Sequence, residues 1–274
     1  MSGTGDPLVQ PPTGDPVARL EHVSVQRDGQ RILSDIDWEI GGGERWVLFG
    51  ANGSGKTTLI DVLSTYSRPT HGLVTLFGRR SGTVDVRDLR KRIGYVGPAP
   101  TSYVRTHLRS IDIVVTGLHA SFVDTRWHHY TDVDWDFATA CLRTLHARHL
   151  AERTFSTLSD GEKKRVLIAR ALMTGPELLL FDEPGSSLDL GARERLVDSL
   201  AALAAERTSP PVVLVTHHVE DIPPGFDHIL MLAAGRIVAK GRLEEVLTSQ
   251  TLSTAFEMPL EVEQRGERWR AWSH

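Results

Sequence analysis

Cysteine is almost missing from this chain of 274 residues, in which Cys141 is the single example. A lone cysteine excludes an internal disulfide, which fits a chain that remains in the reducing cytosol. Apolar runs are short, and none approaches the roughly 18 to 20 residues that a membrane-spanning helix needs. The N-terminus also lacks the basic and apolar pattern of an export signal. The sequence therefore predicts a soluble, cytosolic protein.

An excess of either charge is missing as well, because 31 basic residues face 35 acidic ones and the formal net charge is −4. This balance gives no general attraction to nucleic acid, so we expect no nucleic-acid partner. The basic triplet at 163–165 is accordingly interpreted as a solvated helix face. Hydrophobic residues make up 40% of the chain, which is enough to bury a substantial core.

One stretch matches the pattern G-x-x-x-x-G-K-[ST] of nucleotide-binding loops at every fixed position. It consists of Gly50, Ala51, Asn52, Gly53, Ser54, Gly55, Lys56, Thr57 and Thr58. A short apolar run at 46–49 precedes it, and apolar residues recur at helical spacing over 59–66, so we expect the loop between a buried strand and a helix. A glycine-rich turn that matches by chance is the alternative, and motifs further along the chain argue against it.

Each residue type in this loop has a chemical reason to be there. Glycines allow backbone N–H groups to approach phosphate oxygens closely, and the start of a helix favours an anion. We expect Lys56 to contact the β and γ phosphates of a nucleoside triphosphate. The hydroxyl of Thr57 is expected to ligate Mg²⁺.

Two carboxylates follow a later apolar run at 178–181. Parallel sheets bind ligands at the carboxyl ends of their strands, so Asp182 is expected to hold Mg²⁺ and Glu183 to polarise the water that attacks the γ phosphate. An apolar strand that merely ends in a solvated turn is the alternative, and Pro184 does indicate that the strand stops there.

The segment Leu158, Ser159, Asp160, Gly161 and Glu162 precedes a helical pattern. It resembles the signature motif Leu-Ser-Gly-Gly-Gln of ATP-binding-cassette (ABC) ATPases, with departures at Asp160 and Glu162. The resemblance implies that Ser159 and Gly161 contact the γ phosphate of ATP. Ser159 followed three residues later by Glu162 is also a capping box, and both interpretations can hold together.

Two further segments stand at the spacing of that family. Residues 186–189 resemble its D-loop, which implies that Asp189 lies at the nucleotide. The apolar run 212–216 precedes His217, which resembles the switch histidine that contacts the γ phosphate. His218 is the alternative by a slip of one residue.

The resemblance covers about residues 18–242 and implies an α/β fold. It predicts a P-loop NTPase with a RecA-like core of mostly parallel sheet, an antiparallel β subdomain, and an α-helical subdomain at about 104–160. Residues 1–17 are expected to form a disordered leader. Residues 243–274 are expected to form a C-terminal helical tail.

Two positions depart from the family pattern. The strand expected at 93–96 is normally followed by a glutamine that senses Mg²⁺ and the attacking water and couples the ATPase to a membrane subunit. Here Gly97 and Pro98 follow instead. Arg27 stands where an aromatic residue usually stacks on adenine, and we expect its guanidinium to take that place in the nucleotide site.

Each motif occurs once, and the resemblance implies that ATP is held between two chains arranged head to tail, in a homodimer or with a related cassette. It implies an ATP hydrolase that uses ATP and Mg²⁺ and energises a separately encoded permease from the inner face of the cell membrane. Residues 73–80 and 216–218, together with the altered loop at Gly97, resemble cassettes grouped with molybdate or iron-complex uptake.

Two other functions stay open. A soluble, non-transport ABC ATPase with a regulatory or repair-type role fits the loss of the glutamine, because that residue normally faces the permease. A nucleotide-binding module with negligible hydrolysis is disfavoured by the intact Asp182, Glu183 and His217.

Overall fold

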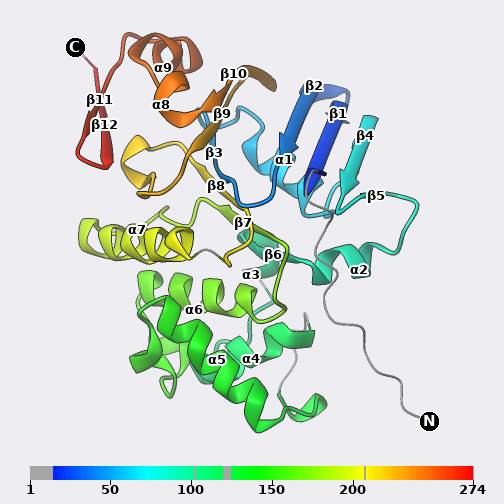
Figure 1. The fold of residues 1–274 in the computed structure, drawn as a ribbon, viewed down its shortest axis with the longest axis vertical. Helices are drawn as coiled ribbons and strands as arrows, with labels where there is room; N and C mark the ends of the chain where they lie inside the picture. The colour runs from blue at the N-terminus through cyan, green and yellow to red at the C-terminus, as the bar shows by residue number, and fades with distance from the viewer. Residues whose placement is uncertain (1–14, 102, 120–124, 207, 274) are drawn as a thin grey trace.

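A computed structural model describes residues 15–101, 103–119, 125–206 and 208–273, and Figure 1 shows its fold. Most of the predicted disordered leader lies outside the described residues. Its last residue, Val17, belongs to the fold, because its side chain is buried and its N–H donates to the carbonyl of Ile40 at 2.7 Å. The prediction is therefore wrong for Val17, which extends the first strand pair.

A six-stranded sheet forms the centre of the molecule in the order β10-β9-β3-β8-β7-β6. Neighbours run parallel except β10, which pairs antiparallel with β9. The strands β3, β7 and β8 are buried along their whole length, as apolar runs covered on both faces should be. The bounds are β3 (Arg45–Phe49), β6 (Ile93–Val96), β7 (Leu178–Asp182), β8 (Val212–Thr216), β9 (His228–Ala233) and β10 (Arg236–Arg242).

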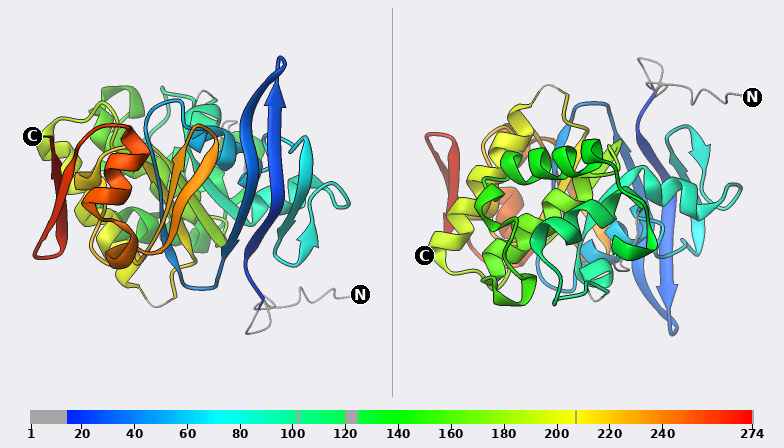
Figure 2. Two further views of the ribbon diagram at one scale, coloured as in Figure 1. Left: turned by 90° about the horizontal axis from the view of Figure 1, so that it is seen from above. Right: turned by 90° about the horizontal axis from the view of Figure 1, so that it is seen from below.

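A second sheet has the order β2-β1-β4-β5 and is antiparallel throughout. The turn between β1 and β2 contains Gly29 at φ 79°, a left-handed conformation that glycine adopts without strain. Figure 2 shows this sheet beside the central one. Its strands are β1 (Ala18–Arg27), β2 (Gln30–Ile40), β4 (His71–Leu76) and β5 (Arg79–Arg80).

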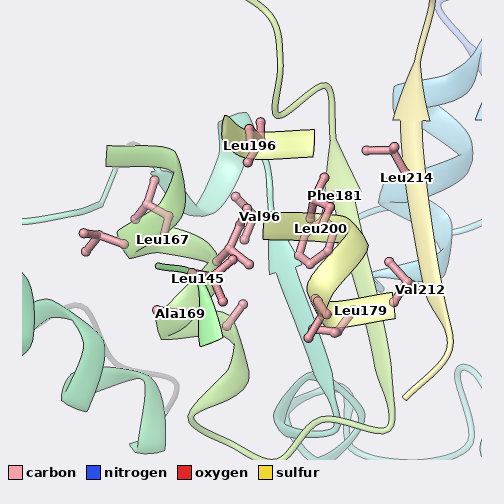
Figure 3. Close-up of a cluster of buried hydrophobic side chains, with 14 of the residues drawn as sticks. Val96, Leu145, Leu167, Ala169, Leu179, Phe181, Leu196, Leu200, Val212 and Leu214 are labelled. Carbon is pink, nitrogen blue, oxygen red and sulfur yellow. The ribbon is translucent and has the colours of Figure 1, made fainter. Parts of the chain in front are cut away.

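Alternation along the central strands divides the buried side chains into two clusters. Val47 and Phe49 of β3 belong to one cluster, whereas Trp46 and Leu48 belong to the other. The first cluster also contains Leu179 and Phe181 of β7 together with residues of the helices, and Figure 3 shows part of it, with Val96, Leu145, Leu167, Ala169, Leu196, Leu200, Val212 and Leu214. The second cluster includes side chains of the antiparallel sheet and of α1 (Lys56–Leu63).

The α-helices between residues 110 and 205 lie together on one side of the central sheet (Figure 1). Both α5 and α6 begin with a capping box, formed by Thr131 with Asp134 and by Ser159 with Glu162. The α-helices between β5 and β8 are α2 (Val86–Lys91), α3 (Pro98–Thr101), α4 (Ser110–Val115), α5 (Asp132–Thr144), α6 (Asp160–Leu172) and α7 (Leu190–Ala205). Short 3-10 helices are η1 (Thr116–His119), η2 (Thr125–Trp127), η3 (Arg148–Leu150), η4 (Phe155–Thr157) and η5 (Val219–Asp221).

The basic triplet at 163–165 lies on α6 and is not one solvated face. Arg165 is buried and donates to the carbonyl of His146 at 3.1 Å, and burial also lowers the pKa of Lys164. Three consecutive residues of a helix point in directions about 100° apart, so they cannot share one exposed face. The prediction is therefore wrong for Arg165.

The C-terminal tail is helical only in its first half. The helices α8 (Leu243–Val246) and α9 (Ser249–Phe256) are followed by a hairpin of β11 (Glu261–Arg265) and β12 (Arg268–Trp272). The prediction of a helical tail is wrong for this last part. Gly266, at φ 64°, permits the tight turn, and Trp269 is buried against the core.

Candidate nucleotide site

The predicted loop and the two predicted strand ends meet at one edge of the central sheet. The strands β3, β8 and β7 are neighbours and run parallel, with Phe49 beside Thr216 and Asp182 beside Val215. The residues that follow these strands therefore converge. This edge is also where ligands bind in open α/β sheets, because chain connections diverge there.

The loop after β3 has a backbone that only glycine permits at two points. Gly50 lies at φ 152°, and a Cβ there would stand 2.2 Å from the carbonyl oxygen of Leu232. Gly55 lies at φ 104° and forms the N-cap of α1, where a Cβ would stand 2.7 Å from Leu33. These glycines allow the loop to pack closely against β2 and β9 and to lead directly into α1.

The loop also presents polar groups suited to an anion. Ser54 has a buried hydroxyl without a hydrogen-bond partner, and no side chain caps the start of α1. Lys56 is buried, and its ammonium donates to the carbonyls of Gly50 and Ala51 at 2.8 and 3.0 Å. Burial lowers the pKa of Lys56, and the nearby carboxylate of Glu183 opposes that shift. The site residues Asn52, Gly53 and Thr57 are exposed, and Thr58 is buried.

Glu183 joins the lysine to the predicted switch histidine. Its Oε1 lies 3.1 Å from Nδ1 of His217 and 3.6 Å from Nζ of Lys56. Glu183 lies at φ 47°, a left-handed conformation that is costly for a residue with a side chain and that recurs at functional sites. The ring of His218 packs beside that of His217, with 4.1 Å between the ring centres, but Glu183 contacts His217.

Asp182 is a buried carboxylate that fits a cation. Only 5% of the residue is exposed, and neither carboxylate oxygen has a hydrogen-bond partner. Burial, followed by the negative charges of Glu183 and Asp61, raises the pKa of Asp182 to about 6, while Thr57 and Lys56 oppose that shift. A hard divalent cation between the carboxylate and the Thr57 hydroxyl would satisfy these oxygens, so the residues present fit Mg²⁺.

The signature segment lies at the start of α6. Ser159 is exposed, and its hydroxyl accepts a hydrogen bond from the N–H of Glu162 at 3.4 Å. Gly161 is buried, and a Cβ there would lie 2.9 Å from Cβ of Ala192 on α7. Asp189 caps α7 by accepting from the N–H of Ala192 at 2.7 Å. Close packing of α6 on α7 is therefore a second reason for the glycine.

Comparison with known proteins decides the family, because the model of the family described as ABC transporter matches residues 33–186. This chain belongs to the ABC transporter family. The ABC transporter ATP-binding protein YlmA of Bacillus subtilis is 39% identical over 90% of this chain and 93% of its own length. The hemin import ATP-binding protein HmuV of Nocardia farcinica is 32% identical over 92% and 86%.

Solved cassettes have the same fold as this ABC chain. The ATP-binding cassette MJ0796, in a dimeric post-hydrolysis structure with ADP and phosphate, superposes with a TM-score of 0.70 at 25% identity, over 82% of this chain and 98% of that one. The predicted family, fold class and ATP-hydrolysing activity are thus confirmed, and the soluble non-transport alternative gains no support. Among the described residues, no helix of this ABC chain has both the length and the apolar character to cross a membrane.

Arg27 of the cassette has partners on the protein. Its Nη2 donates to the hydroxyl of Ser67 at 3.2 Å and lies 3.8 Å from a carboxylate oxygen of Asp61 on α1. The guanidinium of Arg27 is therefore already held by the protein. The stacking of Arg27 on adenine stays a prediction.

Two residues near Asp182, the predicted Mg²⁺ ligand of the cassette, escaped sequence analysis. Asp61 contributes to the raised pKa of Asp182, and Asp182 in turn contributes to a raised pKa of Tyr95, whose main cause is burial. The hydroxyl of Tyr95 is buried without a hydrogen-bond partner. Tyr95 is the next-to-last residue of β6, and a Cβ on Gly97 would lie 2.5 Å from its hydroxyl. A tyrosine inside an apolar strand carries no motif that would single it out.

Proposed function

We propose that this chain is the ATP-binding subunit of a transporter, in which two cassettes close head to tail on ATP and drive a separately encoded permease. The observation that carries the proposal is the contact of one carboxylate, Glu183, with both His217 and Lys56 at the edge where the phosphate loop opens. The names of the relatives YlmA and HmuV support the link to transport. The subunit would then sit at the inner face of the cell membrane.

The residues of the site suit in-line attack of water on a terminal phosphate. Lys56 would move its donors from the loop carbonyls to the β and γ phosphates. Glu183 would accept a proton from the water, and His217 would hold the γ phosphate and keep Glu183 in place. Asp182 and Thr57 would hold Mg²⁺, which neutralises charge on the phosphates when bound.

The second half of the site would come from another copy. Ser159 stands exposed at the start of α6, a 13-residue helix whose N-terminus favours an anion. Dimeric MJ0796, with ADP and phosphate bound, supports a cassette pair as the working unit. A homodimer or a pair with a related cassette would each place a serine loop opposite Lys56.

Purification from native membranes in mild detergent tests the assignment to a transporter. We expect a polytopic membrane protein to accompany the tagged chain in fixed proportion, and ATP hydrolysis by the purified complex to exceed that of the isolated cassette. A cassette that is recovered alone from membranes and cytosol, with unchanged ATPase activity, would favour the non-transport ATPase.

The raised pKa of Asp182 predicts how Mg²⁺ binding depends on pH. Because the pKa is raised to about 6 in the fold, the carboxylate is protonated below that value and cannot hold the cation. The melting-temperature increase that Mg²⁺ adds to that of ATP alone should therefore fall as pH drops through 6. It should be small at every pH in Asp182→Asn.

The raised pKa of Asp182 also predicts how the free energy of unfolding depends on pH when no metal is bound. The pKa of Asp182 in the fold exceeds the ordinary value of 3.8 for an aspartate, so this group destabilises the metal-free fold above pH 6 by on the order of 3 kcal/mol, and the penalty disappears as pH falls toward 4. The difference in free energy of unfolding between wild type and Asp182→Asn should change across this window. A difference that is constant with pH would contradict the assignment.

A further inference from the structure

The C-terminal hairpin contacts two elements that leave the candidate site. Figures 1 and 2 show β11 and β12 at the end of the molecule where α7 lies. From β12, Arg268 donates through Nη1 to Oε2 of Glu194 at 2.6 Å and through Nη2 to Oε1 at 3.1 Å. The same Nη2 also donates to the carbonyl of Glu220 at 2.8 Å. One guanidinium therefore joins α7 to η5.

The two partners of Arg268 lie close in sequence to predicted ATP-contacting residues. Glu194 is in the first half of α7, which begins directly after its N-cap Asp189. Glu220 is in η5, which begins two residues after His217. The hairpin also donates from the N–H of Ala271 to Oε1 of Glu220 at 3.2 Å.

A second link between α7 and η5 leads to the backbone beside the histidine. Arg193 lies next to Glu194, and its Nε is 3.2 Å from Oδ1 of Asp221. The other oxygen of Asp221 accepts from the hydroxyl of Thr216 at 2.9 Å, and that hydroxyl also accepts from the N–H of His218 at 3.1 Å. The peptide that carries His217 is thus fixed on both sides by a network whose outer end is the hairpin.

We propose that Arg268 is a positioning residue for ATP hydrolysis, which holds α7 and η5 together so that His217 stays against Glu183 and Asp189 stays at the cassette interface. This inference rests on the proposed function, because it takes His217 as a γ-phosphate contact. It assigns the C-terminal hairpin, which follows the nucleotide-binding elements in the chain, a part in the geometry of the catalytic site.

The Arg268–Glu194 ion pair is partly exposed, so its loss should affect the position of η5 more than the stability of the fold. The side chain of Glu194 is 43% exposed, and exposed ion pairs add little to folding free energy. The fold at this end is instead held by Trp269, which is buried in the core beside it. Loss of the Arg268 fork should therefore leave the hairpin docked while it loosens η5.

Steady-state ATPase kinetics of Arg268→Gln test the proposal. Because small misplacements of reacting groups cost up to about a hundredfold in rate, we expect kcat to fall roughly tenfold or more while KM and the Kd for ATP change less than about twofold. Arg268→Lys keeps the charge but loses the fork, and should recover part of the rate. Arg270→Gln, an exposed arginine two residues along the same strand, is the matched control and should resemble wild type.

A double-mutant cycle with His217→Ala identifies the route of the effect. If Arg268 acts through the histidine, Arg268→Gln should cause little further loss of kcat in the His217→Ala background. Additive losses, or an equal loss of kcat in Arg270→Gln, would overturn the proposal, as would wild-type kcat in Arg268→Gln. Wild-type kcat in His217→Ala itself would instead reject the proposed role of the histidine. The melting temperature is the last readout. If Arg268→Gln lowers both the melting temperature and kcat, and Arg268→Lys restores both, then Arg268 acts on stability alone and the proposal is overturned.

Discussion

Replacing Glu183 with glutamine should lower kcat for ATP by about 10²-fold to 10⁴-fold, the usual contribution of a positioned general base. Glutamine has nearly the same shape and can still hydrogen-bond to Nδ1 of His217, which lies 3.1 Å from the carboxylate. The variant loses only the ability to take a proton from water. Affinity for ATP should therefore be retained or increased, because the 3.6 Å pairing of Glu183 with Lys56 no longer competes with phosphate.

The quaternary state of Glu183→Gln gives a second measurement. ATP that is bound but not cleaved should keep two cassettes closed, because loss of the γ phosphate is what removes their shared contacts. Size-exclusion chromatography with ATP and Mg²⁺ should show a dimer for the variant and a mixture for wild type. Glu263→Gln, an exposed position on the hairpin, is the control. A variant that stays monomeric with ATP would contradict the head-to-tail pair.

The candidate site residues that stand at the ends of strands could be predicted from the sequence, because the local pattern of apolar residues marks each strand. The glycine loop, Asp182 at the end of β7 and His217 after β8 each follow or end a short apolar run that favours a buried strand, and each run is one. Their convergence depends on the order β3-β8-β7, which pairs strands far apart in sequence. Sequence analysis predicted no strand order, since periodicity gives each strand without its neighbours and the resemblance to ABC ATPases implied only a mostly parallel sheet.

The residues that sequence analysis missed act through long-range contacts. Arg268 and Glu194 are 74 positions apart, and no spacing rule connects a strand in the tail with a helix in the core. Asp61 and Tyr95 likewise approach Asp182 from α1 and β6. The error in the basic triplet has a similar origin, because burial of Arg165 depends on what packs against it. Local pattern assigns an element and its period, whereas burial of a polar face is decided by the tertiary fold.

Lys56→Ala should have the largest effect on binding. Each charge-assisted hydrogen bond to a phosphate contributes about 1.5–3 kcal/mol, so loss of the ammonium should raise the Kd for ATP by at least about tenfold to a hundredfold. Hydrolysis should fall to background, because the lysine also stabilises charge that develops on the γ phosphate. Titration of a fluorescent ATP analogue and single-turnover hydrolysis would measure the two effects separately.

Because Lys56 is buried, its replacement can also lower the stability of the fold, and this effect must be separated from the loss of ATP binding. Only 4% of the residue is exposed, and two loop carbonyls, of Gly50 and Ala51, lose their donor when it is removed. Lys56→Met fills the same volume without the charge, so it should bind ATP as poorly as alanine while it stays closer to wild type in melting temperature. Lys240→Ala, an exposed lysine on β10 that donates to the carbonyl of Asp37, is the control for loss of one surface charge. An ATPase rate that survives in both Lys56 variants would contradict the assignment of Lys56 to the phosphates.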